Sequence, residues 1–399
     1  MQKAKSQIQI ICCISFLILG NVSAIHALEK AEIKVRIFST TNISKTIVST
    51  DYGLYHLLAY DSNLNFLDTV YDIFPLDSIR TFYFSKSGKE VSVSRGNKKI
   101  GVFHAVRLVS EDATREFRIE ANRKNRVYED ALQIRVFKGF LQLVNVVEME
   151  KYVAGVVESE GGHVEELEFF KAQAVLARTF ALKNLEKHKS EGYNLKDDVS
   201  SQVYFSKCHY KNSDCILEAV DLTKDTLIVT ENCSPILGVF HANSGGQTVG
   251  SDHAWYSAID YLQAKHDSFS VGVGSYYWEK RISKKSFYDF VARSMKVSND
   301  ISLHKALLNF SQRERQAYFV HKSHRLKLTK IRTHYKLRST FFSIHEDGDY
   351  LVIKGKGYGH GVGMSQDGAI EMSRRGYSYK DIINFYYSGI ELESIHHLL

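Results

Sequence analysis

The hydrophobic pattern of the chain changes near residue 150. Residues 28–150 consist of short runs of β-branched and aromatic residues, several alternating with polar residues, separated by Gly, Asn, Asp and Ser. Examples are AEIKVRIFS, FHAVRLVS, REFRIEA and LQIRVFKGFLQLVNVVEM. Alternation with a period of two is typical of strands that bury one face. We therefore predict a β meander for this part of the chain.

After Glu150 two segments have a helical pattern. MEKYVAGVV predicts a short helix, and EELEFFKAQAVLARTFALKNLEKHK predicts a long one. Apolar residues recur at helical spacing in the second segment, namely Leu167, Phe170, Ala174, Ala177, Ala181 and Leu185. Its start is acidic and its end, residues 187–189, is basic, as the helix dipole favours. The alanines permit close packing, so this helix is predicted to belong to the core.

The remaining chain adds strands, loops and shorter helices. Residues 200–275 are predicted as strands and loops from runs such as SQVYF and TLIVT, and residues 283–330 as one or two helices followed by strands. YKDIINFYYSG predicts a helix near the end. Because strands and helices segregate rather than alternate, we expect an α+β fold. We divide residues 25–395 of the 399-residue chain into a β-rich region over 25–135 and a mixed α+β domain over 136–395.

The N-terminus has the order of a secretory signal peptide. Lys3 and Lys5 precede an apolar run from Ile8 to Leu19, and the small-residue sequence VSA follows. The alternative is a membrane anchor, but the run is too short to span a bilayer comfortably. We expect cleavage after Ala24, with a second suitable position after Ala27. The mature protein is then expected in the periplasm or cell envelope, with membrane contact only during export.

Charge is distributed unevenly along the chain. The formal net charge is +7, and between Lys280 and Arg338 there are 16 Lys and Arg against three acidic residues. Such a segment, residues 280–338, could bind an anionic envelope surface, bind nucleic acid, or simply be a solvated basic face. Export argues against nucleic acid as a partner.

Three cysteines remain once Cys12 and Cys13 leave with the signal peptide. Cys208 and Cys215 are expected to pair across a short polar loop, which leaves Cys233 single. A zinc site that uses His209 or His241 is the alternative, but the spacing matches no common ligand pattern. We therefore expect no metal and no other cofactor.

Candidate chemistry begins between the two helical segments, in VVESEGGHVEELE. Glu158 and Glu160 precede Gly161 and Gly162 there. A carboxyl group held in a cleft near such a turn has a raised pKa if it is desolvated, and it can then deliver a proton near neutral pH. The alternative is a solvated turn with acidic residues of no special role.

Two glycine-containing stretches supply further candidates. FHANSGGQTVGSDHAW contains Ser244, but the G-x-S-x-G elbow of a serine hydrolase is absent. GKGYGHGVGMSQDGA, residues 355–369, lacks the G-K-[ST] ending of a phosphate loop and is predicted to be a loop followed by a helix that ends at Gly376. His360 in this loop could bind a metal, donate to a substrate, or be a buried structural histidine.

Taken together, these stretches resemble the SpoIID/LytB family of bacterial cell-wall proteins. The resemblance rests on the ordered set LVNVVEMEKYVAGVVESE, FFKAQAVLARTFAL, SSQVY, FHANSGGQTVGSDHAW, LRSTFFSI and GKGYGHGVGMSQDGAIEMSRRGYSYKDIINFYYSG. It covers residues 141–390, whereas residues 28–140 resemble the family only loosely.

The resemblance implies a lytic transglycosylase that cuts peptidoglycan glycan strands stripped of stem peptides. Counted from Tyr152, the family's catalytic glutamate falls on Glu160, where Gly161 and Gly162 replace the usual Met-Pro. The other positions that the resemblance implies for a glycan-binding cleft are Gln202, Tyr204, Ser244, Gly245, Gly246, His360, Gly361, Ser365 and Gln366. Lys171 and Arg178 lie in the helix motif and either face the cleft or brace it.

The resemblance also leaves an alternative function open, and at one point this sequence differs from the pattern of the family. One branch of the family is described as a modifier of a cell-wall amidase, so this chain could bind glycan and stimulate an amidase without catalysis. Some members carry Cys and His near the QVY motif, where a metal can bind. Here Lys196, Ser200 and Ser201 occupy those positions, so that metal site is expected to be absent.

Overall fold

The computed structural model describes residues 32–112, 115–255 and 257–397. The expected signal peptide, with Cys12 and Cys13, lies outside the described residues. The described chain is a mixed, sheet-rich α+β fold with a β-rich N-terminal region, as predicted. It forms two compact units: unit 1 contains residues 32–165, 173–227 and 393–397, and unit 2 contains residues 166–172 and 228–392. Within the described ranges, no helix is long and apolar enough to cross a membrane.

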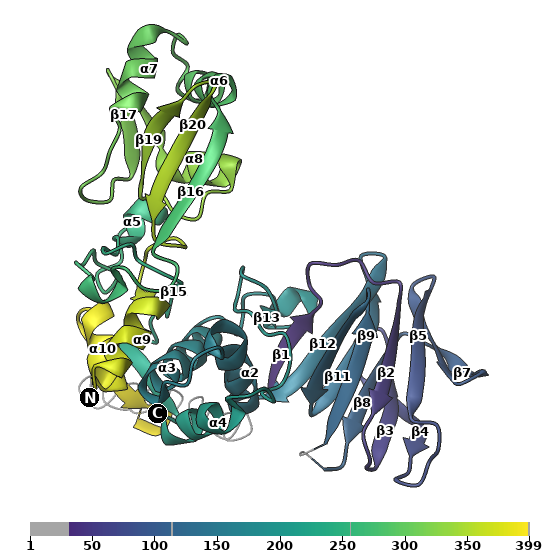
Figure 1. The fold of residues 1–399 in the computed structure, drawn as a ribbon. Helices are drawn as coiled ribbons and strands as arrows, with labels where there is room; N and C mark the ends of the chain where they lie inside the picture. Colours follow the sequence, from purple (N-terminus) through teal and green to yellow (C-terminus); the bar gives the residue numbers. More distant parts are fainter. Residues whose placement is uncertain (1–31, 113–114, 256, 398–399) are drawn as a thin grey trace, which may run out of the picture. The chain divides into compact units, whose positions relative to one another are not determined.

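Two sheets lie face to face in unit 1 (Figure 1). The first has the strand order β13-β1-β12-β11-β8-β3-β4, and the second β10-β9-β2-β5-β6-β7. The strands of the first sheet are β1 (Glu32–Ile37), β3 (Tyr55–Tyr60), β4 (Phe66–Ile73), β8 (Ala105–Ser110), β11 (Ala131–Phe137), β12 (Phe140–Glu148) and β13 (Leu195–Lys196). Those of the second are β2 (Lys45–Thr50), β5 (Thr81–Ser87), β6 (Glu90–Arg95), β7 (Lys98–Phe103), β9 (Glu116–Ala121) and β10 (Lys124–Glu129).

The sequence pattern explains the individual strands. In β1 the residues are alternately exposed and buried, as the alternation of polar and apolar residues requires. β11 and β12 form a hairpin whose two turn residues, Lys138 and Gly139, both have positive φ, which suits the twist of a tight hairpin. β12 is buried from Leu141 to Val147, because it contacts β5 and β10 of the other sheet as well as helix α2 (Met149–Gly161).

The helices of unit 1 correct two predictions. α3 (Leu167–Lys183) ends before residues 187–189, so these basic residues do not form its last turn; its first residues group with unit 2. A turn and the short 3-10 helix η1 (Lys189–Glu191) follow. α4 (Ser213–Leu222) lies in a segment that we expected to contain only strands and loops, and SQVYF is not a strand. Ile216, Ala219 and Val220 form the buried face of α4.

Unit 2 combines short elements with longer helices near its C-terminal end. β15 (Phe240–His241) pairs in parallel with β21 (Met364–Ser365), where the predicted loop ends and α9 (Gln366–Arg374) begins. The predicted C-terminal helix is α10 (Tyr379–Tyr386). The remaining elements of unit 2 are α5 (Ser251–Ala254) and η2 (Ser268–Ser270). The pair β14 (Thr226–Thr230) and β22 (Ile390–Ser394) has residues in both units, and η3 (Ile395–His397) belongs to unit 1.

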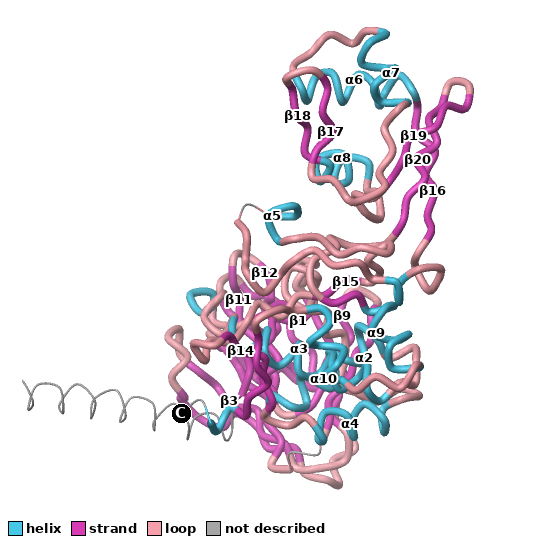
Figure 2. Tube along the Cα trace, turned by 90° about the vertical axis from the view of Figure 1, so that its left-hand side faces the viewer, coloured by secondary structure: helices cyan, strands magenta, loops and turns pink. Residues whose placement is uncertain are grey.

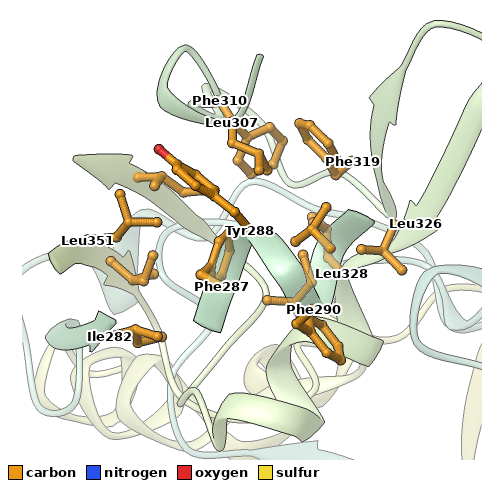
Figure 3. Packing of buried hydrophobic residues seen from close by; sticks show 14 of the residues in the cluster. Ile282, Phe287, Tyr288, Phe290, Leu307, Phe310, Phe319, Leu326, Leu328 and Leu351 are labelled. Carbon is orange, nitrogen blue, oxygen red and sulfur yellow. The ribbon is translucent and has the colours of Figure 1, made fainter. Parts of the chain in front are cut away.

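Residues 277–356 form a module with its own hydrophobic core inside unit 2 (Figures 2 and 3). Every buried residue of this core lies between Trp278 and Ile353, including Phe287, Leu307 and Phe319. The module consists of the sheet β16-β20-β19, the hairpin β17-β18 and three helices. Their bounds are β16 (Tyr277–Ser283), α6 (Lys284–Met295), α7 (Ile301–Leu308), β17 (Tyr318–His321), β18 (His324–Lys327), α8 (Leu328–Tyr335), β19 (Phe342–Asp347) and β20 (Tyr350–Lys356).

Candidate active site

The last turn of α2 holds the segment 203–210 by a ladder of hydrogen bonds. The Val203 N–H donates to Glu160 Oε1 at 2.9 Å, and the Phe205 N–H donates to Ser159 Oγ at 3.1 Å. The N–H groups of His209 and Tyr210 donate to Glu158 Oε1 at 2.9 and 2.7 Å. Backbone donors without partners in their own strand or helix are thus satisfied by three consecutive side chains of α2.

Glu158 and Glu160 bind different parts of the segment 203–210. The Glu158 side chain is 6% exposed, and its Oε1 also accepts from Cys208 Sγ at 3.4 Å. A carboxylate with three donors on one oxygen is a structural anchor for the loop it binds. Glu160 is half-buried, and its Oε1 accepts from the Val203 N–H.

Burial raises the pKa of Glu160 above that of an ordinary glutamate, and the Val203 hydrogen bond opposes the shift only in part. The position at the C-terminal end of α2 acts in the same direction as burial, because the helix dipole disfavours an anion there. A carboxyl group in this environment keeps its proton to a higher pH, as a general acid must.

Tyr152 and Gln202 complete the surroundings of Glu160. Tyr152 is fully buried and donates to Gln202 Oε1 at 3.1 Å. Burial, aided by the charge of Glu160, raises the pKa of Tyr152, so the phenol stays protonated. Gln202 is 2% exposed, and its Nε2 has no acceptor among the described residues. A buried amide donor left without a partner is uncommon, which singles out Gln202 among the residues near Glu160.

Tyr204 is a packing residue rather than an exposed contact. It is 1% exposed, its Oη donates to Asn145 Oδ1 at 2.9 Å, and its ring packs 5.1 Å from that of Tyr152 and 5.6 Å from that of Tyr128. The hydroxyl and the ring of Tyr204 are therefore used inside unit 1. This positions the chain between Gln202 and Ser206 without presenting Tyr204 to a ligand.

Gly155 allows the segment 203–210 to lie on α2. A Cβ at this position would be 2.5 Å from both Ser206 O and the ring of Tyr204. Contacts this short do not occur, so only glycine fits while Tyr204 and Ser206 keep their places. The sequence signal for this residue was a glycine in the middle of a helical pattern, where glycine is otherwise unfavourable.

We expect Gly155→Ala to lower the free energy of unfolding by about 1–3 kcal/mol, because the methyl group must displace Tyr204 or the backbone of Ser206. Denaturant unfolding of the purified proteins measures the change. The direction of the change in the free energy of unfolding tests the account, because at a helix position without such contacts the same substitution stabilises by roughly 0.5–1 kcal/mol. A stabilised variant would contradict this account of Gly155.

Arg178 braces the helices of unit 1. Its side chain is 1% exposed, and Nε and Nη2 donate to the two carboxylate oxygens of Glu150 at 2.8 and 2.6 Å. Its Nη1 donates to Thr226 O at 3.1 Å. The guanidinium therefore ties α3 to α2 and to the start of β14. Of the two roles left open by the sequence, the structure assigns bracing to Arg178.

In unit 2 the predicted serines belong to a buried network around Asp267. Ser244 Oγ donates to Asp267 Oδ2 at 2.7 Å, Ser270 Oγ binds the same oxygen, and Ser270 and Ser365 hydroxyls lie 2.7 Å apart. All four residues are completely buried. Burial raises the pKa of Asp267, and the hydroxyl donors oppose the shift. Ser244 and Ser365 thus bind protein groups, and Ser365 also caps α9.

The glycines of residues 357–363 are required by packing within unit 2. Gly357, Gly359, Gly361 and Gly363 all have positive φ. A Cβ at Gly361 would lie 1.9 Å from Arg315 Nη1, and a Cβ at Gly359 would lie 2.6 Å from His241 Cβ. The resemblance places Gly361 in a glycan-binding cleft, but the protein's own side chains already occupy the space beside Gly361 and Gly359.

His360 is neutral at physiological pH. Burial, reinforced by the charge of Arg332, lowers the pKa of His360 to about 4. Its Nδ1 accepts from the Val362 N–H at 3.1 Å, and its ring lies 5.4 Å from that of His241 and 5.6 Å from that of Trp255. It borders a cavity of about 10 Å³, enough for about one water molecule. Among its three alternatives, a largely structural histidine fits these contacts best.

The other predicted contacts of unit 2 lie at helix starts and turns. Gly245 and Gly246 have positive φ, and Gly245 packs against Lys356. Gln366 is the first residue of α9 and is half-buried. Lys171 Nζ donates to Glu168 Oε1 at 2.6 Å. The structure therefore groups Glu160, Gln202, Tyr204 and Arg178 in unit 1 and the remaining predicted residues in unit 2.

Comparison with known proteins identifies the family. The SpoIID family model, described as Stage II sporulation protein, matches residues 138–229, which contain Glu160 and the segment 203–210. Stage II sporulation protein D of Bacillus amyloliquefaciens is 31% identical over 277 residues, which are 66% of this chain and 79% of that protein. The chain belongs to the SpoIID family. Within it, the amidase enhancer of Bacillus subtilis (strain 168) is 30% identical over 294 residues, 60% of this chain and 40% of that protein.

The described cysteines of this SpoIID-family chain form no disulfide. Cys208, Cys215 and Cys233 are not bridged, so the expected disulfide between Cys208 and Cys215 is wrong for this structure. Cys208 instead donates to Glu158, the anchor of the segment 203–210. In the described ranges, no three His, Cys, Asp or Glu side chains are grouped so that they could hold a metal ion.

Proposed function

We propose that this protein is an exported lytic transglycosylase that cuts the MurNAc–GlcNAc bond of peptidoglycan strands stripped of stem peptides, with Glu160 as its catalytic acid and base. Membership of the SpoIID family, together with a relative named amidase enhancer, supports a role at the cell wall. Export rests on the N-terminal sequence alone. The observation that carries the catalytic role is the half-buried carboxyl group of Glu160 with its raised pKa.

A single carboxyl group is sufficient for this reaction. Hydrolysis of a glycoside usually needs two carboxyl groups, one for the leaving oxygen and one for water or for a covalent intermediate. In the transglycosylase reaction Glu160 protonates the bridging oxygen as its bond to C1 of MurNAc breaks. The C6 hydroxyl of the same sugar attacks C1, and its proton passes to the Glu160 carboxylate. The products are a 1,6-anhydro end and a free GlcNAc hydroxyl, and Glu160 is again protonated.

Gln202 is the best-placed sugar contact beside Glu160. Its Oε1 is fixed by Tyr152, and its Nε2 has no acceptor among the described residues. Because this atom is buried, an N-acetyl carbonyl or a hydroxyl oxygen of the glycan satisfies it only once the Gln202 side chain turns toward the ligand. Fixing the sugar next to the acid contributes to catalysis by orientation.

The test of the proposed function is mass spectrometry of products from two substrates, namely intact peptidoglycan and the same material stripped of stem peptides by an amidase. We expect fragments with 1,6-anhydro ends from the stripped strands. Fragments that have gained water would show a hydrolase, and the absence of any fragment would favour the second candidate below.

The second candidate is a glycan-binding modifier of a cell-wall amidase. It is favoured by the relative named amidase enhancer, which shares 30% identity with this chain. This role needs no acid at position 160. It is distinguished by adding the protein, with Glu160 replaced by Gln, to an amidase and measuring release of stem peptides: stimulation by the variant supports this candidate.

The cleavage rate is expected to fall as pH rises through the pKa of Glu160. The active form carries the proton, and because burial raises the pKa, the active range extends above that of an ordinary glutamate near 4.3. The raised pKa also stabilises the folded protein at pH values below the pKa that Glu160 has in the unfolded chain. This contribution to the free energy of unfolding is lost as pH rises through the pKa of Glu160 in the folded protein. Initial rates between pH 4 and 8 measure the first effect; a rate that rises throughout this range would contradict the acid role.

A further inference from the structure

The 277–356 module carries the positive charge of the whole chain. It contains 18 Lys and Arg against seven Asp and Glu, a net charge of +11, whereas the formal charge of all 399 residues is only +7. The rest of the chain is therefore net negative, at −4. Since this module also has its own core, it is a distinct structural element with a strong positive field.

One concave site lies within this field, and we call it the basic pocket. It is an open pocket of about 500 Å³ formed by α8, by Phe290 of α6 and by the end of β18. Its lining residues are Phe290, Lys327, Thr329, Lys330, Thr333 and His334. A volume of this size accommodates a small ligand such as one or two sugar rings.

The basic pocket offers donors and cations but no carboxylate. Lys330, Thr333 and His334 are exposed, and no acidic residue is among the lining residues. The acidic residue next to Phe290 in sequence, Asp289, is engaged by Lys285 at 3.0 Å and by Asn299 at 2.7 Å. The His334 ring stacks on Phe290 with centroids 3.9 Å apart, which leaves a flat ring at the edge of the pocket.

The shape and polarity of α8 favour a polar anion over a membrane surface. Leu328 and Ile331, the apolar residues of this helix, are buried in the module core. The exposed residues are polar, so α8 has no apolar face to insert into lipid. A hollow with hydroxyl groups and lysines fits a hydroxyl-bearing anionic molecule better than it fits a flat bilayer.

We infer that the basic pocket binds the carboxylates of stripped glycan. This inference rests on the proposed function, because it explains how the proposed substrate is distinguished. Hydrolysis of the amide between the lactyl group of MurNAc and its stem peptide leaves a carboxylate on each MurNAc, so the stripped strand is a regular polyanion. Lys330 supplies the charge contact, Thr333 a hydroxyl donor and His334 a ring that contacts the sugar.

The experiment measures binding of the full mature chain, in the Glu160→Gln background so that no strand is cut. The ligands are stripped glycan strands, the same strands with their carboxylates converted to amides by carbodiimide coupling, and vesicles that contain phosphatidylglycerol. The variants are Lys330→Glu and Lys305→Glu. Lys305 is an exposed lysine of α7 outside the pocket, so both variants change the net charge of the module equally.

We expect Lys330→Glu to weaken binding of stripped strands about tenfold at low salt, because an attraction becomes a repulsion. Lys305→Glu is expected to change it less than twofold, and added salt to reduce the difference. Lys330→Ala, which introduces no repulsion, should give an intermediate loss. The amidated strands should bind the Lys330→Glu variant as well as they bind the protein with Lys330 intact.

Three results would overturn the inference. Equal losses for Lys330→Glu and Lys305→Glu would show that overall charge, not the pocket, controls binding. Equal affinity for amidated and untreated strands would show that the carboxylates are not recognised. Vesicle binding that depends on Lys330 while glycan binding does not would assign the pocket to lipid. None of these results depends on whether Glu160 is catalytic, which product analysis decides separately.

Discussion

Glu160→Gln is expected to lower the rate of glycan cleavage about 10³-fold without loss of the fold. General acid–base catalysis by one side chain contributes roughly 10² to 10⁴ in rate, and an amide cannot supply the proton. Glutamine has the same shape and keeps an oxygen for the Val203 N–H, which lies 2.9 Å from Glu160 Oε1. Initial rates of release of anhydro fragments measure the loss, and thermal unfolding checks the fold.

Glu158→Gln is the matched control for this prediction. It makes the same chemical change two residues earlier in the same turn of α2, at a side chain that anchors the loop through His209 and Tyr210. Loss of the charge weakens these hydrogen bonds by about 1 kcal/mol, so a small loss of stability and at most a modest loss of rate are expected. Equal rate losses in the two variants would mean that the turn matters only as a scaffold and that Glu160 has no catalytic role.

The parts of the fold set by local pattern were predictable from the sequence. Alternating runs such as EIKVRI became strands with one buried face, and the loop before Gln366 became the start of a helix capped by Ser365. α4 was missed although its signal was present: Ile216, Ala219 and Val220 have helical spacing. The sequence prediction of a disulfide-closed loop between Cys208 and Cys215 overlaps the start of this helix and hides its pattern.

The parts of the site set by distant contacts were not predictable in the same way. Nothing in the sequence near Gly361 reveals that Arg315 fills the space beside it, because these two residues lie far apart in the chain and meet only in the folded protein. Likewise the resemblance places Ser244 and Ser365 in a glycan-binding cleft, but both belong to one buried network around Asp267, a residue in no motif. Glu160 was found by resemblance, whereas its difference from Glu158 required the geometry of the segment 203–210.

Arg178→Met is expected to lower the free energy of unfolding by about 3 kcal/mol. The substitution leaves Glu150 without its two guanidinium donors and Thr226 O without its own. Breaking a buried ion pair by removing one partner costs roughly 3–5 kcal/mol, and the lower value applies because the Glu150 side chain is 17% exposed. Urea unfolding measures the change, and Lys171→Met on the same helix is the control, since its more accessible pair with Glu168 is worth less than about 1 kcal/mol.

The double variant Glu150→Met/Arg178→Met separates the cost of an unpaired carboxylate from the cost of lost packing. Replacing both members of a buried ion pair by apolar side chains is often close to neutral, so the double variant should recover at least about 1 kcal/mol relative to Arg178→Met alone. If instead the double variant loses as much free energy of unfolding as Glu150→Met and Arg178→Met lose in sum, the guanidinium and the carboxylate act independently. Bracing of α3 against α2 would then come from apolar packing rather than from the ion pair.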